Sequence, residues 1–237
     1  MLREHVLGLA ETDPRVVAGA EVGSLATGAG DRWSDLDLTF GVEDGSSIGE
    51  VLEDFTHDLV DNREAVKLFD LPFESTIYRV FLLPGSLQFD LSFTPASEFG
   101  ARGPKFALLF GDAVERAHTA APSAHELFGW AVHDAVRARF CIERGRLWQA
   151  VYLIGEVRNG ALALACLRRG LEARYARGVH ELPAATAASF EETLVHSAEP
   201  EELLRALRSV VAALLREQGG AENLAAKLQG QLEELVR

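Results

Sequence analysis

Residues 22–41 read VGSLATGAGDRWSDLDLTFG, and this stretch decides the fold of the first half of the chain. A β-rich run ends at Val22, a glycine-rich loop follows, and DLDLTFG at 35–41 alternates apolar and polar residues as a β-strand does. Side chains two apart on a strand point to the same face, so Asp35 and Asp37 share one face. Two such carboxylates repel each other unless a cation lies between them, and Mg²⁺ prefers oxygen ligands. The stretch therefore predicts a metal site on a sheet.

A third carboxylate, Asp90, lies between Phe89 and Leu91 in a later β-like run. A lone aspartate inside an apolar strand is costly unless it is paired or bound to a metal. If its strand neighbours that of Asp35 and Asp37, three carboxylates converge. Two metal ions held there would activate an attacking hydroxyl and neutralise a triphosphate.

A glycine and a serine follow the first predicted strand, at Gly23 and Ser24. Glycine lets the backbone approach phosphate oxygens closely, and the serine hydroxyl and nearby amides can donate hydrogen bonds to them. The sequence contains no GxxxxGK[ST] loop, which argues against a P-loop mechanism.

These parts in this order resemble the signature of the DNA polymerase β-like nucleotidyltransferase superfamily: Gly-Ser, ten residues, Asp-x-Asp, then apolar-Asp-apolar on a later strand. GS…WSDLDL looks like its small-molecule branch, which includes aminoglycoside and lincosamide nucleotidyltransferases, and the resemblance covers residues 15–95. It implies that Gly23 and Ser24 bind the triphosphate of ATP or another NTP, and that Asp35, Asp37 and Asp90 ligate Mg²⁺. It also implies transfer of a nucleoside monophosphate, AMP from ATP, to a hydroxyl of a small molecule such as an aminoglycoside.

The resemblance leaves two candidates for the general base, Asp90 and another carboxylate. Related antibiotic-modifying enzymes can draw a base from the helical half, and on that analogy Glu156, in an apolar stretch, would deprotonate the acceptor. The alternative for Glu156 is an internal ion pair with Arg158 or another arginine. Trp148 and Tyr152 either line an acceptor pocket or belong to the core.

Three further residues are candidates for nucleotide binding. Arg32 precedes Asp35 in the loop and could touch phosphate, or it could be a solvated arginine. Ser34 could orient a carboxylate by a hydrogen bond or merely start the strand. Lys105 could reach the triphosphate as a point charge, or it could serve only as a surface lysine.

The two halves of the chain differ in texture, with short β-rich runs and turn signals in residues 1–112 and Ala-, Leu-, Arg- and Glu-rich helices in residues 123–237. We predict an α+β protein: a nucleotidyltransferase-type mixed β-sheet domain at 1–112, followed by a C-terminal helical bundle domain at 123–237 that binds the acceptor or dimerises. Expected strands are 15–22, 35–41, 76–83, 87–93 and 106–110, with a hairpin turn at 84–86; expected helices are 2–11, 48–59, 123–144, 147–173, 203–215 and 224–235.

The net charge of −13 is concentrated in the front half, with 19 acidic and 6 basic residues through Gly100 and 17 of each thereafter. Such a surface repels phosphate backbones, so nucleic acid is not an expected partner, whereas a cationic small molecule is. Solubility alone would also explain the acidic surface. The absence of a signal-like or membrane-spanning apolar stretch predicts a cytoplasmic location without a membrane partner. Cys141 and Cys166 are expected to be buried thiols.

Other functions remain as alternatives. An antitoxin-like or regulatory nucleotidyltransferase would act on a protein partner instead of a small molecule. Arg174 and His180 loosely fit the Arg-x(4–6)-His motif of helical HEPN ribonucleases, although Gly178 and Pro183 suggest that His180 lies in a loop. A homodimer is also an alternative, since some relatives build the site across two chains.

Overall fold

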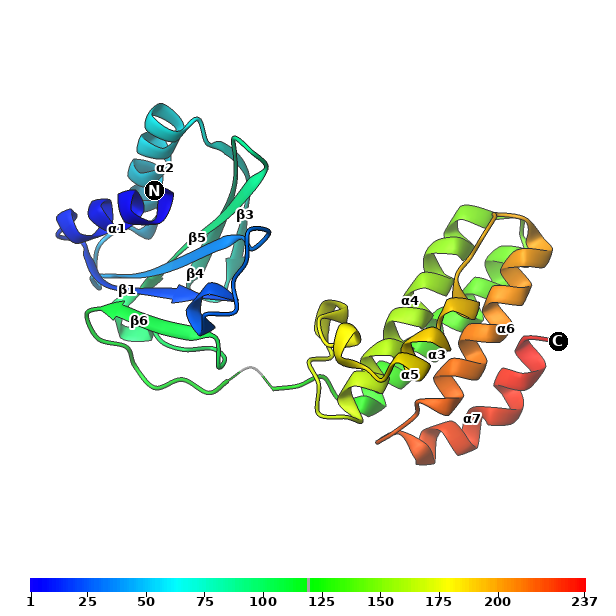
Figure 1. The fold of residues 1–237 in the computed structure, drawn as a ribbon. Coiled ribbons are helices and arrows are strands. Elements are labelled where there is room, and N and C mark those ends of the chain that lie inside the picture. Colours follow the sequence, from blue (N-terminus) through cyan, green and yellow to red (C-terminus); the bar gives the residue numbers. More distant parts are fainter. Residues whose placement is uncertain (119) are drawn as a thin grey trace. The chain divides into compact units, whose positions relative to one another are not determined.

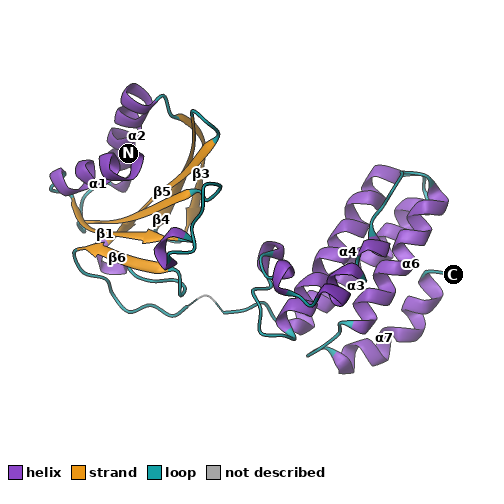
Figure 2. Cartoon of the chain, viewed as in Figure 1, coloured by secondary structure: helices purple, strands orange, loops and turns teal. Residues whose placement is uncertain are grey.

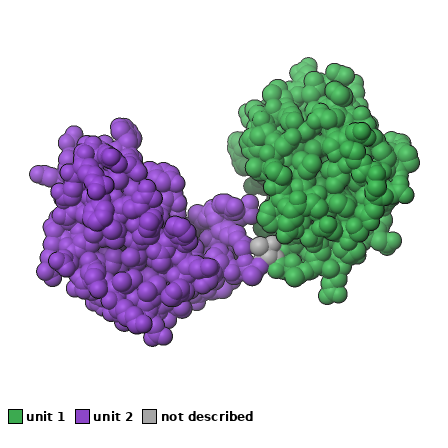
Figure 3. All heavy atoms as spheres, turned by 180° about the vertical axis from the view of Figure 1, so that it is seen from behind, with its two compact units in different colours: residues 1–119 green, residues 120–237 purple. Residues whose placement is uncertain are grey.

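The computed structural model describes residues 1–118 and 120–237, and the chain divides into two compact units, Met1–Thr119 and Ala120–Arg237 (Figure 3). The first unit is α+β and the second is helical, as the α+β prediction requires (Figure 2). Each unit has a hydrophobic core of its own, so each is described by itself.

A six-stranded mixed sheet forms the centre of the first unit, in the order β3-β4-β5-β2-β1-β6 (Figure 1). Its neighbouring strands run antiparallel except β2 and β5, which run parallel. The strands are β1 (Val16–Val22), β2 (Leu36–Val42), β3 (Val66–Phe73), β4 (Thr76–Leu83), β5 (Leu87–Pro95) and β6 (Phe106–Phe110), and the helices are α1 (Leu2–Thr12) and α2 (Ile48–Arg63).

Alternation along the central strands sends apolar side chains to one face of the sheet and polar side chains to the other. Leu38 and Phe40 of β2, with Leu91 and Phe93 of β5, are fully buried in the core that α1 and α2 complete. Helix α2 starts at Ser47, whose side chain accepts a hydrogen bond from the Glu50 amide at 3.3 Å. The opposite face is therefore the one that carries Asp37 and Asp90.

The hairpin between β4 and β5 confirms the predicted turn at 84–86. Gly85 and Ser86 both have positive φ, 80° and 62°, so the chain reverses within three residues. Positive φ is readily adopted by glycine and costs little in a tight turn. This turn fixes the register of β5 against β4, in which Asp90 lies opposite Val80.

Strand β3 was not predicted from the sequence. It is an edge strand with every residue exposed, and its register against β4 shifts between Lys67 and Phe69. The shift interrupts the period-2 alternation of polar and apolar residues, and Pro72 argues against a strand. The alternation that reveals a strand is thus interrupted within β3.

The second unit contains five helices among its described residues, in agreement with the predicted bundle (Figure 1). Ser123 caps the first of them by accepting a hydrogen bond from the Glu126 amide at 3.4 Å. Cys141 and Cys166 are both buried and not disulfide-bonded, as expected. The helices are α3 (Ala124–Glu143), α4 (Leu147–Leu167), α5 (Ala184–Ala188), α6 (Pro200–Arg216) and α7 (Glu222–Leu235).

Helix α4 is shorter than predicted, because it ends at Leu167 and not near residue 173. Gly170, with φ of 68°, follows the last turn, and the Leu171 amide donates to the Cys166 carbonyl at 3.0 Å. This glycine-based cap satisfies the final carbonyls and stops the helix.

By length and composition α4 could cross a membrane, with a mean hydropathy of 1.3 over its most apolar window. Half of that window is buried inside the protein, where Ala150, Leu153, Ile154 and Val157 contribute to the helical core. The core helix of a folded bundle has this composition as well.

Candidate active site

Three carboxylates meet on the sheet face that α1 and α2 leave uncovered. Strands β2 and β5 run parallel with Asp37 directly opposite Asp90, and Asp35 lies two residues before Asp37. One oxygen from each of the three carboxylates lies within 4.8 Å of the others, and all three side chains are partly exposed. The register of two strands that are about fifty residues apart in the chain thus brings the predicted metal ligands together.

The electrostatics of this triad favour a cation. Partial burial raises the pKa of the Asp90 carboxyl above its ordinary value, and the negative charge of Asp35 raises it further. The Gln88 amide, which donates to Asp90 Oδ1 at 3.1 Å, opposes the rise. Clustered oxygen ligands of this kind match the donor set that Mg²⁺ prefers, and the ion would offset their mutual repulsion.

Gly23 lies beside the triad at the end of β1. Its φ is 75°, and its amide donates to the Lys105 carbonyl at 3.2 Å. A Cβ at this position would clash with Oδ2 of Asp37, so the carboxylate occupies the space that any side chain would need. Glycine is therefore required for both its backbone conformation and its small size.

Ser24 follows as the first residue of a short turn, the 3₁₀-helix Leu25–Thr27. Its carbonyl accepts hydrogen bonds from the Thr27 and Ala29 amides, at 3.3 and 3.1 Å. Its hydroxyl caps no helix. The loop after β1 is thus folded by its own backbone, and Gly23 at its start borders the Asp37 carboxylate.

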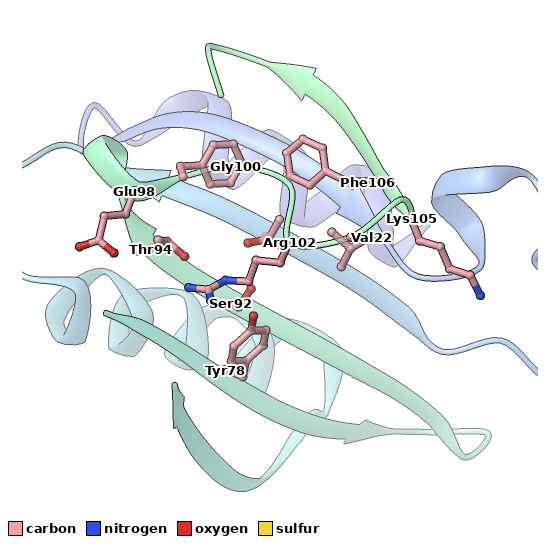
Figure 4. A pocket seen from close by; sticks show the side chains of 12 residues that line it. Val22, Tyr78, Ser92, Thr94, Glu98, Gly100, Arg102, Lys105 and Phe106 are labelled. Atoms are coloured by element: carbon pink, nitrogen blue, oxygen red, sulfur yellow. The ribbon is translucent and has the colours of Figure 1, made fainter. Parts of the chain in front are cut away.

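The three other candidates for nucleotide binding have different surroundings. Arg32 is exposed and its guanidinium stacks on the Trp33 ring, 4.4 Å from the ring centroid. The Ser34 hydroxyl contacts Asp31, accepting from the Asp31 amide at 2.9 Å, so it pairs within the loop and not with Asp35. Lys105 contributes its carbonyl to Gly23, and its side chain points away from the centre of the nearby cavity (Figure 4).

A cavity of about 170 Å³ opens on the same sheet face, beyond the carboxylates. It holds hydroxyls that were not singled out in the sequence, although they continue the period-2 pattern of Asp37 and Asp90 along the same strands. The loop before β6 adds Arg102, for which the sequence carries no signal. Its lining residues include Thr39, Tyr78, Ser92, Thr94, Arg102 and Phe106 (Figure 4).

Glu156 belongs to the helical unit, on α4. It accepts a hydrogen bond from Asn159 at 3.3 Å, and no ion pair joins it to Arg158 or another arginine within the described residues, so the internal ion pair is not observed. It lines a groove of about 370 Å³ together with Asp134, Trp130 and Tyr175.

The two aromatic residues proposed for an acceptor pocket, Trp148 and Tyr152, are neither in the core nor among the residues lining this groove. Both lie on the surface of α4, with 80% and 64% of their area exposed. The aromatic residues that line the groove are Trp130 and Tyr175. Helical spacing gives the face of a helix, but only the packing of α3 beside α4 decides which face borders a groove.

Arg174 and His180, which loosely fit the ribonuclease motif, do not lie on a common α-helix. Arg174 and His180 lie in separate 3₁₀ turns, Arg174–Ala176 and Val179–Glu181, and the His180 side chain is exposed. Arg174 donates to the Ala120 carbonyl. The structure thus gives this pair no shared helical surface.

No family model matches the chain, and no curated protein matches it. Among solved structures, the chain is similar to an aminoglycoside 6-adenyltransferase from Bacillus subtilis, at 15% identity and a TM-score of 0.41, covering 98% of this chain and 96% of that one. It is also similar to a nucleotidyltransferase-like protein from Exiguobacterium sibiricum, at 10% identity and a TM-score of 0.40, covering 96% and 78%. Since both TM-scores are below 0.5, the case for function rests on Asp35, Asp37, Asp90 and the Gly23 turn.

Proposed function

We propose that this protein is a Mg²⁺-dependent nucleotidyltransferase that moves a nucleoside monophosphate, AMP from ATP, to a hydroxyl of a small molecule and releases pyrophosphate. One observation carries the proposal: Asp35, Asp37 and Asp90 place carboxylate oxygens within 4.8 Å of one another on an uncovered sheet face. A triad of carboxylates is costly without a cation, and the turn beside it would offer backbone amides to phosphate oxygens.

Each group has a distinct task under this proposal. Asp35, Asp37 and Asp90 would hold Mg²⁺, which would neutralise the negative charge that develops on the phosphates. The Ser24, Leu25 and Ala26 amides, with the Ser24 hydroxyl, would bind the β- and γ-phosphates and orient pyrophosphate as the leaving group. The acceptor oxygen then attacks the α-phosphorus, and the bond from this phosphorus to the β-phosphate oxygen breaks.

The proton of the attacking hydroxyl needs a base. Asp90 is the candidate within the first unit, because its carboxylate belongs to the triad at which the reaction would take place. Glu156 is the candidate from the helical unit, with a partly exposed carboxylate in a groove. Glu156→Gln tests the candidate from the helical unit.

A cationic acceptor suits the charges and aromatic rings of the helical groove. Asp134 and Glu156 offer two carboxylates there, while Trp130 and Tyr175 offer ring faces, and both kinds of group attract ammonium ions. The excess of acidic residues in the first half adds a long-range attraction for such a molecule. These features support an amine-bearing acceptor, of which an aminoglycoside is one example.

The test combines binding and turnover. Calorimetry with ATP, GTP, CTP and UTP in the presence of Mg²⁺ measures nucleotide binding, and pyrophosphate release is followed with a panel of aminoglycosides, lincosamides and other hydroxylated amines. We expect Mg-dependent binding of an NTP and acceptor-dependent release, both lost in Asp35→Asn/Asp37→Asn. Binding of no NTP together with no release would contradict the proposal. Labelling of a co-purified protein by radioactive ATP, with every small acceptor inactive, would assign the acceptor to the protein class.

A further inference from the structure

A row of three hydroxyls crosses the sheet next to the carboxylates. Tyr78 of β4 is opposite Ser92 of β5, which is opposite Thr39 of β2. Thr39 and Ser92 each lie two residues after an aspartate of the triad, so their side chains share the face of the triad. At a rise of about 3.3 Å per residue, this row lies roughly 7 Å from the carboxylates.

The Ser92 side chain points into the cavity. Ser92 is 2% exposed, and its hydroxyl hydrogen-bonds none of the described residues. No fully buried polar side-chain atom among those residues lacks a partner, so the Ser92 oxygen must open onto the cavity and not into closed packing. A buried hydroxyl that faces a cavity can form a hydrogen bond with a polar ligand that enters it.

Two of the lining residues present planar groups to the cavity. Phe106 contributes a ring, held against Phe99 at a centroid distance of 5.8 Å. Arg102 extends toward Ser92 and Thr94 (Figure 4) and is fixed by hydrogen bonds to Glu74 at 2.9 Å and Thr76 at 3.3 Å. Rings and guanidinium groups of this kind stack on flat heteroaromatic ligands.

We propose that this cavity binds the base of the nucleotide, so that the Thr39, Ser92 and Tyr78 hydroxyls contact its polar edge while Phe106 and Arg102 flank its faces. The proposal rests on the proposed function, which places the phosphates at Gly23 and the triad. Its volume of about 170 Å³ suits one small ring system. Sites for drug-sized ligands such as a multi-ring acceptor typically reach about 300–1,000 Å³. A separation of roughly 7 Å from the carboxylates leaves the space that a ribose occupies between α-phosphate and base.

The test distinguishes binding of the base from binding of the phosphates. Calorimetry in Mg²⁺ compares the preferred NTP with inorganic tripolyphosphate, which has no base, for the wild type, Ser92→Ala, Tyr78→Phe and Thr39→Val. Ser97→Ala, a serine outside the cavity, and Tyr152→Phe, on the helical unit, are matched controls. Thermal unfolding of each variant confirms that it is folded.

We expect Ser92→Ala and Tyr78→Phe to weaken the NTP about five- to tenfold each, as loss of one hydrogen bond does, and to leave tripolyphosphate and both controls unchanged. Preference among the four NTPs should fall by a similar factor. Unchanged NTP affinity in all three variants overturns the proposal, as does an equal weakening of tripolyphosphate. An increase in the acceptor KM alone overturns it as well and assigns the cavity to the acceptor. Failure of the wild type to bind either ligand contradicts the proposed function itself.

Discussion

The Asp37 carboxylate lies against the backbone of Gly23, in the space that a Cβ at residue 23 would take. The glycine ends β1 and the aspartate lies within β2, and the antiparallel register of these strands puts them side by side, with Glu21 opposite Leu38. The turn proposed to bind phosphate and the strand proposed to bind metal therefore meet at one atom, Oδ2 of Asp37. A change at residue 23 must move the carboxylate of residue 37.

Gly23→Ala should lower transferase activity by at least about a hundredfold, because displacing one ligand by an ångström disrupts the alignment that in-line transfer needs. Gly28→Ala is the matched control: its φ of 69° imposes similar backbone strain, but a Cβ there meets nothing within 4 Å. We expect Gly28→Ala to lose only about 1 kcal/mol of stability and to keep most activity. Steady-state kinetics and thermal unfolding of both variants measure this. Equal losses of activity would show that strain, and not the clash with Asp37, limits residue 23.

Asp35→Asn should increase stability and abolish metal binding. In EDTA the substitution removes one of three clustered negative charges, so the free energy of unfolding should rise by about 0.5–1 kcal/mol. In Mn²⁺ the order should reverse, because the metal stabilises only the wild type. Thermal unfolding with and without Mn²⁺ and electron paramagnetic resonance titration provide the measurements. Asp112→Asn, an exposed aspartate outside the triad, should change neither, and Mn²⁺ stabilisation of Asp35→Asn equal to that of the wild type would disprove a metal site.

Acid should weaken the link between α2 and the edge of the sheet. The buried Arg79 binds Asp70 through two bonds of 2.7 and 2.8 Å and donates to Thr56 of α2 at 2.7 Å. Hydrogen bonding to Arg79, and then to Lys67, lowers the pKa of Asp70 from 3.8 to about 2. A carboxyl whose pKa is lowered by folding stabilises the protein above its ordinary pKa and loses that contribution as the pH falls through the folded value.

Asp70→Asn should therefore lower the free energy of unfolding at pH 7 by about 1–2 kcal/mol, a figure reduced because Asp70 is one-third exposed. The difference from the wild type should shrink as the pH falls from about 4 to about 2. Urea unfolding at a series of pH values tests this, with the exposed Asp61→Asn as control. A difference that stays constant down to pH 2 would show that the contribution of Asp70 does not depend on its charge.

Glu156→Gln should affect the acceptor and not the nucleotide. Glu156 is not one of the residues proposed to bind metal or phosphate, so Mg-NTP affinity should be unchanged. If the groove binds an amine-bearing acceptor, the acceptor KM should rise about tenfold, because one charged hydrogen bond is lost. Asn159→Ala, which removes the hydrogen-bond partner of Glu156, is the control for its orientation. A fall in kcat that follows the ionisation of a carboxylate, with KM unchanged, would instead identify Glu156 as the base, and an unchanged kcat and KM would exclude it from the reaction.

Much of the fold could be predicted because its elements carry local signals. The alternation in DLDLTFG, the Pro-Gly-Ser turn and the Ser123 cap each depend on residues close together in the chain, and the structure contains all three features. Strand β3 was missing from the prediction, and the predicted end of α4 near residue 173 was wrong. A register shift interrupts the alternation of β3. Helix α4 stops at a glycine-based cap, in which the Leu171 amide donates to the Cys166 carbonyl, and the apolar periodicity of the sequence does not reveal this hydrogen bond.

The sequence by itself determined that Asp35 and Asp37 share a face, because period-2 geometry is a property of any strand. It also marked Asp90 as an aspartate among apolar neighbours. Only the tertiary structure decided that Asp90 joins the pair, because α2, β3 and β4 intervene and the parallel pairing of β2 with β5 sets the register. It likewise decided that Gly23 borders Asp37 and that Tyr78, Ser92 and Thr39 form one row, since neither relationship involves residues near each other in the chain. Local periodicity fixes which way a side chain points, whereas the folding of distant segments fixes what it faces.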